Sequence, residues 1–302
     1  MCTRNQRTVR LSFNNLGYCP DKGTGLALGS LVRNNITDSV RVVRVDQVNS
    51  YEWVDQNDTS YLERSADPNV VRHPFMAVQT SEDSFLLLEG AAYFHHLKSL
   101  GIDHVPVQIC SEDTVELRSA RLVLFGFSLQ DLTRLSLAHP DQVIIDEKNH
   151  PSPPSFVSGK IEFTGREPIT IHFRHSSKSG CPTAMDFLFR TILSKGRYQK
   201  GPESGTRPDT PFRVDEPSAR MTLPVFTLAD MISAASSDRY FPPSVLNLRT
   251  PFRIFNIDFP LSVLESELPR EEKEAFLRDL ILFREQARRT TYFEGPVYIL
   301  NR

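Results

Sequence analysis

The sequence predicts a protein of the α/β class, and three observations support this. A continuous apolar run from Phe85 to Leu88 is too short for a stable helix and indicates a buried strand. Apolar positions between Ala91 and Leu100 then recur at helical spacing, and Gly101 is placed to end that helix. Val105 to Ile109 resumes with strand residues. The unit is therefore predicted as strand, tight turn, helix and strand.

The elements before this unit complete a first domain, predicted at 36–112. Residues 1–35 have no sustained period and are expected to be an extension, wrapped on the surface or partly disordered. Val40 to Val48 is predicted as a strand, Asn49 to Arg64 as a loop that leads into a short helix, and Pro74 to Val78 as another strand.

The rest of the chain, 113–302, is predicted as an α+β C-terminal domain. Leu122 to Phe125 is either a strand or a turn of buried helix, because periodicity does not separate the two. Residues 160–163 and 169–173 alternate across a turn and predict a hairpin. Asp186 to Leu193 has a helical pattern, and 196–215 is rich in Gly and Pro and is expected to be a mobile surface loop.

The C-terminal third contains a capped helix, a strand, a long helix and a last strand. Thr227 and Asp230 form a possible capping pair for the short helix. Residues 252–258 alternate like a strand, and Pro296 to Leu300 is the last strand. The long helix opens at Pro269, and its apolar stripe is predicted from the spacing of these residues: Phe276, Leu280 and Phe283, widened by Leu277 and Ile281.

Composition excludes several classes of protein. The 302 residues, 39% hydrophobic and 24% charged, are typical of a soluble globular chain with ample length for a core. A formal net charge of −2 gives no overall preference for DNA or an anionic membrane. No apolar run approaches the length of a membrane span or a signal peptide. The four cysteines are far apart, without a Cys-x-x-Cys pair, so we expect neither a structural zinc site nor a disulfide framework. We therefore expect the protein to lie in a reducing cytoplasm.

The turn before the central helix has a chemical consequence. A glycine directly before a helix leaves unpaired backbone N–H groups at the positive end of the helix dipole, where a phosphate can bind. Most such turns bind nothing, so the turn alone is weak evidence. If it binds phosphate, the groups involved are those of Gly90, Ala91, Ala92 and Tyr93.

The order of these features resembles the ParB/sulfiredoxin superfamily. The family turn reads Asp-Gly-x-His-Arg, whereas this chain has Glu89, Gly90, Ala91, Ala92 and Tyr93, so the frame is kept and the His and Arg are absent. Residues 241–264, the long helix and the terminal Gly-Pro-Val-Tyr-Ile-Leu are similar to the C-terminal half of the free-serine kinase branch, which includes an archaeal and a staphylococcal member. The resemblance covers about 41–302 and is weakest over 115–225. It implies a ParB/sulfiredoxin-like N-terminal domain packed on the C-terminal domain.

The resemblance implies a kinase that phosphorylates free L-serine, or a similar small hydroxy amino acid, to O-phosphoserine. It implies ATP or ADP with Mg²⁺ as cofactors, and a role in precursor supply for a siderophore or another specialised metabolite. The family's catalytic base falls on Glu52, and its acidic turn residue, which helps hold the metal-nucleotide, falls on Glu89.

The substrate-binding residues are less well defined. Trp53, the one tryptophan, lies beside Glu52. The family has a Thr-Arg-His element that aligns with three residues here, and of these only Asn247 is polar and none is a cation. The cations that could replace the missing ones are Arg249, Arg253 or Lys98.

A second functional class stays open, a catalytically inactive relative that binds a ligand or partner and acts in regulation. Losing cationic clamps commonly slows phosphoryl transfer by a factor of about 10³ or more. In such a protein Glu52 would be an ordinary exposed glutamate. Glu89 would only cap the start of the helix, where a negative charge is favourable without any ligand. Arg284, Arg288 and Arg289 are candidates for DNA contact, although a basic last turn is expected from the helix dipole alone.

Overall fold

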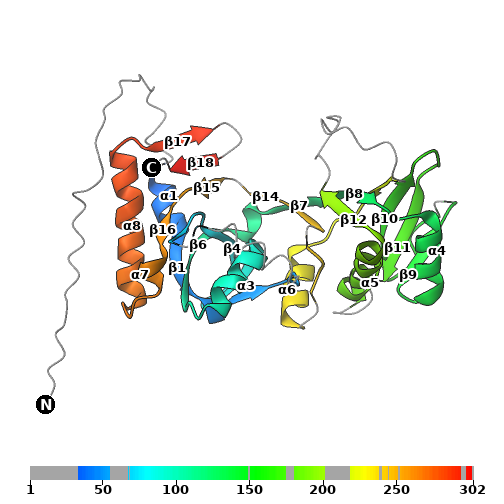
Figure 1. The fold of residues 1–302 in the computed structure, drawn as a ribbon, viewed down its shortest axis with the longest axis horizontal. Helices are drawn as coiled ribbons and strands as arrows, with labels where there is room; N and C mark the ends of the chain where they lie inside the picture. The colour runs from blue at the N-terminus through cyan, green and yellow to red at the C-terminus, as the bar shows by residue number, and fades with distance from the viewer. Residues whose placement is uncertain are drawn as a thin grey trace, which may run out of the picture.

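The structure is a computed structural model. It describes residues 33–54, 67, 69–148, 150–174, 180–200, 218–237, 240–243, 245–250, 252–293 and 297–300. The extension as far as residue 32, the short helix expected before Arg64 and residues 201–217 lie outside this part of the chain. Figure 1 shows two lobes, one around α3 and α8 and the other around α4 and α5.

The first lobe contains a five-stranded mixed sheet in the order β1-β6-β4-β5-β2. Its helix α3 follows β5 directly, and β6 comes next, so the predicted strand, turn, helix and strand are confirmed. The bounds are α1 Arg33–Ser39, β1 Val40–Arg44, β2 Val48–Ser50, β4 Phe75–Ser81, β5 Ser84–Glu89, α3 Ala91–Ser99 and β6 His104–Cys110.

The single strand predicted over Val40 to Val48 is in fact two strands. The 3-10 turn η1, Val45–Gln47, separates β1 from β2, and these two strands occupy the two edges of the sheet. Five flat strands would separate the edges by about 19 Å, whereas four Cα steps span at most about 15 Å. The sheet is therefore curled, which brings its edges toward each other.

Each face of the first sheet packs into its own core. Along β5, Leu86 and Leu88 face a core shared with the second lobe. Phe85 and Leu87 face the other core, formed with α3, α8 and the C-terminal strands. Because both faces are covered, β5 is apolar and buried from Phe85 to Leu88, between Ser84 and Glu89 at its two ends.

The second lobe is a six-stranded antiparallel sheet in the order β12-β8-β13-β10-β11-β9, with α4 against β9 and α5 against β11. Residues 122–125 form a strand, and the hairpin is confirmed. Arg197–Lys200 was expected within a loop but forms the edge strand β12. The bounds are β8 Arg121–Phe125, α4 Leu129–Ala138, β9 Val143–Asp146, β10 Phe156–Phe163, β11 Ile169–Arg174, α5 Gly180–Lys195, β12 Arg197–Lys200 and β13 Ser218–Thr222.

Three elements lie between the lobes in Figure 1: β7 Glu116–Ser119, its partner β14 Leu246–Arg249, and α6 Leu228–Ser236. The 3-10 turn η2, Glu112–Thr114, precedes β7. The predicted cap of α6 is confirmed, because Thr227 Oγ1 accepts from the backbone N–H of Asp230 at 3.2 Å and the Asp230 carboxylate accepts from the Thr227 N–H at 2.8 Å.

The C-terminal segment returns to the first lobe, where α8 packs on β1. Residues 252–258 form only the short strand β15, since Asn256 and Asp258 adopt positive φ values of 57° and 41°. The bounds are β15 Arg253–Phe255, β16 Phe259–Pro260, α7 Leu261–Leu264, α8 Arg270–Gln286, β17 Thr290–Phe293 and β18 Val297–Leu300, and β16 pairs with β3, Val70–Val71.

The buried stripe of α8 differs from the prediction. Its buried residues are Lys273, Leu277, Ile281 and Arg284, whereas Phe283 is 39% exposed. The two buried cations are stabilised by hydrogen bonds to the carbonyls of Leu264 and Asn256, respectively, which apolar periodicity does not reveal.

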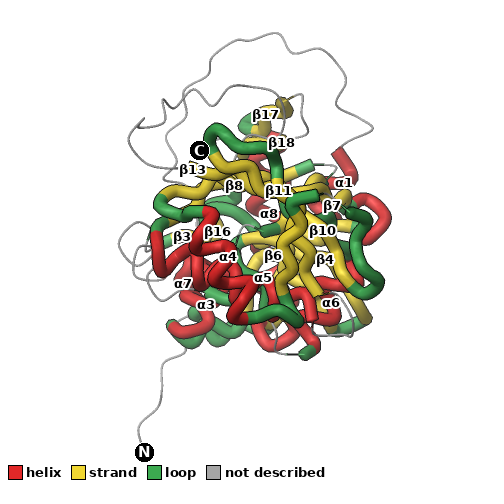
Figure 2. Tube along the Cα trace, turned by 90° about the vertical axis from the view of Figure 1, so that its right-hand side faces the viewer, coloured by secondary structure: helices red, strands yellow, loops and turns green. Residues whose placement is uncertain are grey.

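Figure 2 shows the strands gathered toward the middle of the molecule with helices mostly around them. Within the described residues, no helix is long and apolar enough to cross a membrane.

Candidate functional site

The turn between β5 and α3 has the geometry that the sequence predicts. Gly90 adopts φ 90° and ψ 21°, a left-handed conformation in which glycine is favoured, and its carbonyl accepts the N–H of Phe94 at 2.9 Å. A Cβ at Gly90 would lie 3.0 Å from Cδ1 of Phe75. The N–H groups of Ala91, Ala92 and Tyr93 form the first turn, which has no partners within the helix.

A cavity of about 410 Å³ opens beside this turn. It brings together four of the predicted site residues, Glu89, Gly90, Tyr93 and Arg253, from two parts of the chain. Sequence reasoning missed the other polar residues that line it: Asp67, Arg72 and His73.

Glu89 and Arg253 form an ion pair at this cavity. Their side chains are 37% and 33% exposed, so the pair is accessible to solvent. The Arg253 guanidinium also lies 5.0 Å from the centre of the Phe255 ring, which limits its orientation. A cation is therefore present beside Gly90, although the turn itself contains none.

His73 also contacts Phe255. Its ring meets the Phe255 ring edge-on, with centroids 5.1 Å apart, and its Nδ1 accepts the backbone N–H of Asn256 at 3.0 Å. Partial desolvation, followed by the charges of Arg72 and Arg253, lowers the pKa of His73 below its usual value. The ring is thus neutral near pH 7, and its proton is on Nε2.

The loop that holds His73 is fixed from α8. The buried Arg284 donates to the carbonyl of Asn256, and its guanidinium lies 3.8 Å from the Asp258 carboxylate. The N–H of Asp258 donates to the carbonyl of Arg72 at 3.2 Å. These contacts fix Arg72 and His73 relative to β15. The Arg284 side chain is 10% exposed and engaged here, so it is not a surface residue for DNA contact.

Glu52 follows β2, the strand that pairs with β5, and β5 ends at Glu89. Strands β2 and β5 are parallel and are paired as far as Ser50 and Leu87, so Glu52 and Glu89 each lie two residues beyond this last pair. Beyond the end of β2, Glu52 forms a bridge with Phe241. The structure thus brings the ends of these two strands together.

Tyr51 connects these two carboxylates electrostatically. Its hydroxyl donates to the carbonyl of Leu88 at 2.9 Å in a buried position. Burial, followed by the negative charges of Glu52 and Glu89, raises the pKa of Tyr51 well above its usual range. Both carboxylates therefore act on one phenol from the carboxyl ends of β2 and β5.

The remaining predicted residues do not line the cavity beside Gly90. Trp53 is half-buried, and its backbone N–H donates to the carbonyl of Phe241. Its indole Nε1 is buried and has no hydrogen-bond partner in the described part of the chain. Asn247 is buried in β14 opposite Arg118. Arg249 is exposed on the same strand opposite Glu116. Their roles in substrate binding stay predictions.

The residues present fit Mg²⁺ in one mode only. Among the described residues, no group of three or more His, Cys, Asp or Glu side chains could hold a metal ion. Kinase sites, however, bind Mg²⁺ through one or two carboxylates together with nucleotide phosphates. The accessible Glu89, next to the phosphate-accepting turn, fits that mode.

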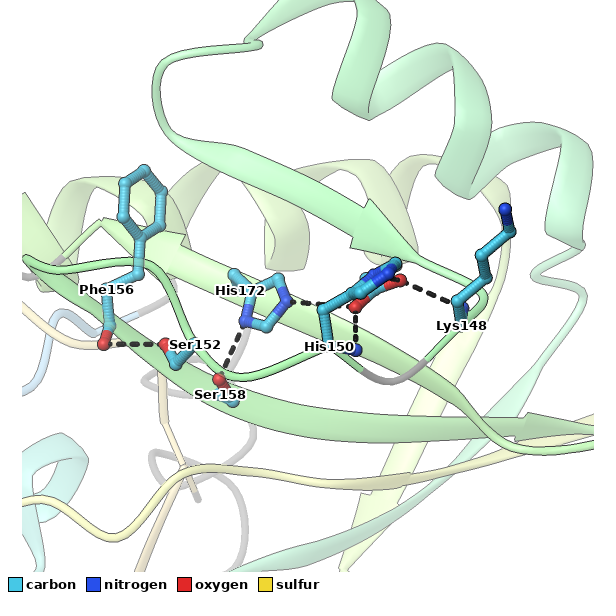
Figure 3. A network of polar contacts seen from close by, with 7 residues as sticks. Lys148, His150, Ser152, Phe156, Ser158 and His172 are labelled. Atoms are coloured by element: carbon cyan, nitrogen blue, oxygen red, sulfur yellow. Dashed lines mark hydrogen bonds and ion pairs between the residues drawn. The ribbon is translucent and has the colours of Figure 1, made fainter.

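A second polar network lies in the other lobe and joins β9, β10 and β11 (Figure 3). Ser158 Oγ is 2.7 Å from Nδ1 of the buried His172, whose Nε2 is 3.8 Å from the Asp146 carboxylate. Asp146 also contacts His150 at 3.0 Å. The 3.8 Å separation is too long for a hydrogen bond, and none of these residues lines the cavity beside Gly90. The network cross-links the sheet.

Comparison with known proteins gives matches among solved structures only. No protein-family model matches the chain, and neither does any curated protein sequence. A C-terminally truncated SbnI from Staphylococcus aureus is similar, with a TM-score of 0.66 and 15% identity over 83% of this chain and 99% of that one.

A free serine kinase is also similar. Its complex with AMP has a TM-score of 0.56 and 15% identity, over 75% of this chain and 93% of that one. A mutant of that kinase in complex with ADP has a TM-score of 0.57 and 13% identity, over 75% and 94%. This chain therefore has the fold of SbnI and of the free serine kinase, as the resemblance predicts.

Proposed function

We propose that this protein is a nucleotide-dependent kinase of free L-serine or a similar small hydroxy amino acid. The observation that carries the proposal is the cavity beside Gly90, where a carboxylate, a glycine turn at a helix start and the guanidinium of Arg253 meet. Structures with the same fold are complexes with AMP and ADP. A nucleotide bound with its phosphates at this turn is consistent with both observations.

Phosphate binding is assigned to the start of α3. The N–H groups of Ala91, Ala92 and Tyr93 and the positive end of the helix dipole attract phosphate oxygens, and no acidic residue in the first turn opposes them. Gly90 lets the backbone approach the ligand because it has no side chain. Arg253 adds the positive charge that phosphoryl transfer requires.

Glu52 is assigned the role of general base. Its carboxylate accepts the proton of the serine hydroxyl as the oxygen attacks the terminal phosphorus. A new O–P bond forms to serine, and the bond between that phosphorus and the leaving nucleotide breaks, so ATP yields ADP or ADP yields AMP. Trp53, next to Glu52, is assigned to the substrate side.

Mg²⁺ would be held by Glu89 together with phosphate oxygens. It would supply neutralisation of the charge on the phosphates during transfer. Glu89 must then exchange Arg253 for the metal-nucleotide, and its exposed position allows this exchange. The precursor pathway that consumes the phosphoserine stays a prediction.

One observation favours the alternative, a catalytically inactive ligand-binding or regulatory protein. Glu89 is already paired with Arg253, and the turn has Ala92 and Tyr93 where the resemblance implies His and Arg. Such a protein would bind nucleotide without transferring phosphate.

The test is direct detection of the product. Purified full-length protein is incubated with Mg²⁺, ATP or ADP, and L-serine, L-threonine or L-homoserine, and phosphorylated amino acids are measured by mass spectrometry. Phosphoserine that accumulates linearly with enzyme concentration is the expected result. Nucleotide binding without any phosphorylated product from any of the three acceptors supports the alternative.

A further inference from the structure

The cavity contains donors that do not come from the glycine turn. Arg72 and His73 follow β3, and Arg253 begins β15, so two segments distant in sequence converge on the same 410 Å³ space as Glu89 and Gly90. The turn contributes backbone N–H groups but no basic side chain. Any anion that enters this cavity therefore meets side-chain donors from outside the turn.

His73 is arranged to donate rather than to accept. Its Nδ1 is occupied by the N–H of Asn256 at 3.0 Å, so the neutral ring carries its hydrogen on Nε2. The ring is held edge-on against Phe255, and Arg253 lies over that same Phe255 ring at 5.0 Å. One aromatic side chain thus orients both an imidazole and a guanidinium at one cavity.

The segment behind His73 is held by a hydrogen bond from α8. Asn256, which donates to the imidazole, has its own carbonyl bonded to Arg284 of α8. Asn256 adopts φ 57°, a left-handed conformation that asparagine tolerates better than most residues. The orientation of Nδ1, and hence of Nε2, is fixed by the fold and not by a ligand.

We propose that His73 donates its Nε2–H to a phosphate oxygen of the nucleotide, beside Arg253, and so supplies the donor that the turn after β5 lacks. This inference rests on the proposed function, and it adds a phosphate-binding residue from β3–β4 that the sequence did not indicate. The ligand class it selects is a polyphosphate chain with at least one terminal phosphate at Arg253.

The experiment measures binding of inorganic tripolyphosphate and of ADP by isothermal titration calorimetry. His73→Phe keeps an aromatic ring but removes both ring nitrogens, whereas His73→Gln keeps an oxygen for the Asn256 N–H and an amide donor in place of Nε2–H. We expect His73→Phe to weaken both affinities about tenfold or more, as is typical for a lost hydrogen bond to a charged group, and His73→Gln to recover most of the loss.

Folding and site are separated by two controls. His150→Phe changes an exposed histidine of the other lobe and is expected to bind both ligands like the wild type. Thermal melting shows whether His73→Phe and His73→Gln are equally folded. If His73→Gln is folded and still fails to recover affinity, or if His73→Phe binds tripolyphosphate normally, the inference is wrong.

The outcomes also separate this inference from the kinase proposal. Tripolyphosphate binding that depends on His73, without any phosphoserine formation, supports the phosphate donor and contradicts the kinase. Normal phosphoserine formation by His73→Phe supports the kinase proposal and contradicts the assignment of His73 as a phosphate donor. A wild-type protein that does not bind tripolyphosphate overturns the assignment of His73.

Discussion

Arg253 pairs with Glu89 and so joins the start of β15 to the end of β5. The contact places a guanidinium beside a glycine turn whose own helix begins without any charged residue. It also means that Glu89 is neutralised by a protein cation in the structure described here. Arg253 therefore pairs with the Glu89 carboxylate in this structure and, under the proposed function, binds the phosphates when nucleotide is present.

Replacing Arg253 by Gln is expected to weaken ADP and tripolyphosphate binding about tenfold or more, because a charge-assisted contact to phosphate is lost and Glu89 is left with an unpaired negative charge in the cavity. Calorimetric titrations at low and high salt measure the effect, which should shrink as salt screens the phosphate charge. Arg278→Gln, an exposed substitution on α8, is the matched control. Equal affinities for the wild type and Arg253→Gln would remove Arg253 from the site.

Replacing Glu52 by Gln is expected to slow phosphoserine formation by a factor of about 10² to 10⁴, the usual contribution of a general base. ADP affinity should change by less than about twofold, because Glu52 follows β2 and does not line the cavity beside Gly90. Turnover by quenched-flow mass spectrometry and titration with ADP measure the two effects separately. A variant that keeps full turnover shows that the hydroxyl proton leaves by another route.

The central unit was predictable because its signals are local. A four-residue apolar run, a glycine that must adopt positive φ, and helical spacing closed by Gly101 are all read within one stretch, and the structure confirms β5, α3 and β6. The side-chain donors of the cavity could not be found in this way. Arg72 and His73 lie in a short segment without period, and they meet β15 only because the chain returns to the first lobe after residue 250.

Two misread elements have similar causes. The strand expected over residues 40–48 breaks at η1 because β1 and β2 take different partners across a curled sheet, which is a tertiary requirement. The stripe of α8 was predicted from apolar residues alone, yet Lys273 and Arg284 occupy its buried face. These two side chains donate hydrogen bonds to carbonyls in the segments before the helix. The spacing of residues within the helix cannot predict such bonds.

Replacing Gly90 by Ala is expected to destabilise the protein more than replacing Gly101, although both glycines adopt positive φ at the two ends of α3. Positive φ alone costs an L-residue about 1–2 kcal/mol. At Gly90 the new Cβ also lies 3.0 Å from Phe75 Cδ1, whereas at Gly101 nothing lies within 4 Å. Urea denaturation of both variants gives the difference. Equal losses would show that the Phe75 ring moves aside without cost.

Replacing Tyr51 by Phe is expected to make the protein less stable by about 1 kcal/mol at pH 8, because the buried hydrogen bond to the Leu88 carbonyl is lost. The difference should narrow as the pH rises above 10. Burial, with the charges of Glu52 and Glu89 adding to it, raises the pKa of Tyr51 in the folded protein above its unfolded value.

Below pH 10 both the folded and the unfolded protein keep the Tyr51 proton, so this group gives stability no pH dependence. Above pH 10 only the unfolded chain releases it, and the wild type loses free energy of unfolding by at most about 1.4 kcal/mol per pH unit from this group. Tyr51→Phe lacks that loss, so the two stability curves converge. Urea denaturation at pH 8, 9, 10 and 10.5 measures the gap between them. A gap that stays constant over this range would mean that the phenol ionises in the folded protein as easily as in the unfolded chain, and that burial together with Glu52 and Glu89 does not raise the pKa of Tyr51.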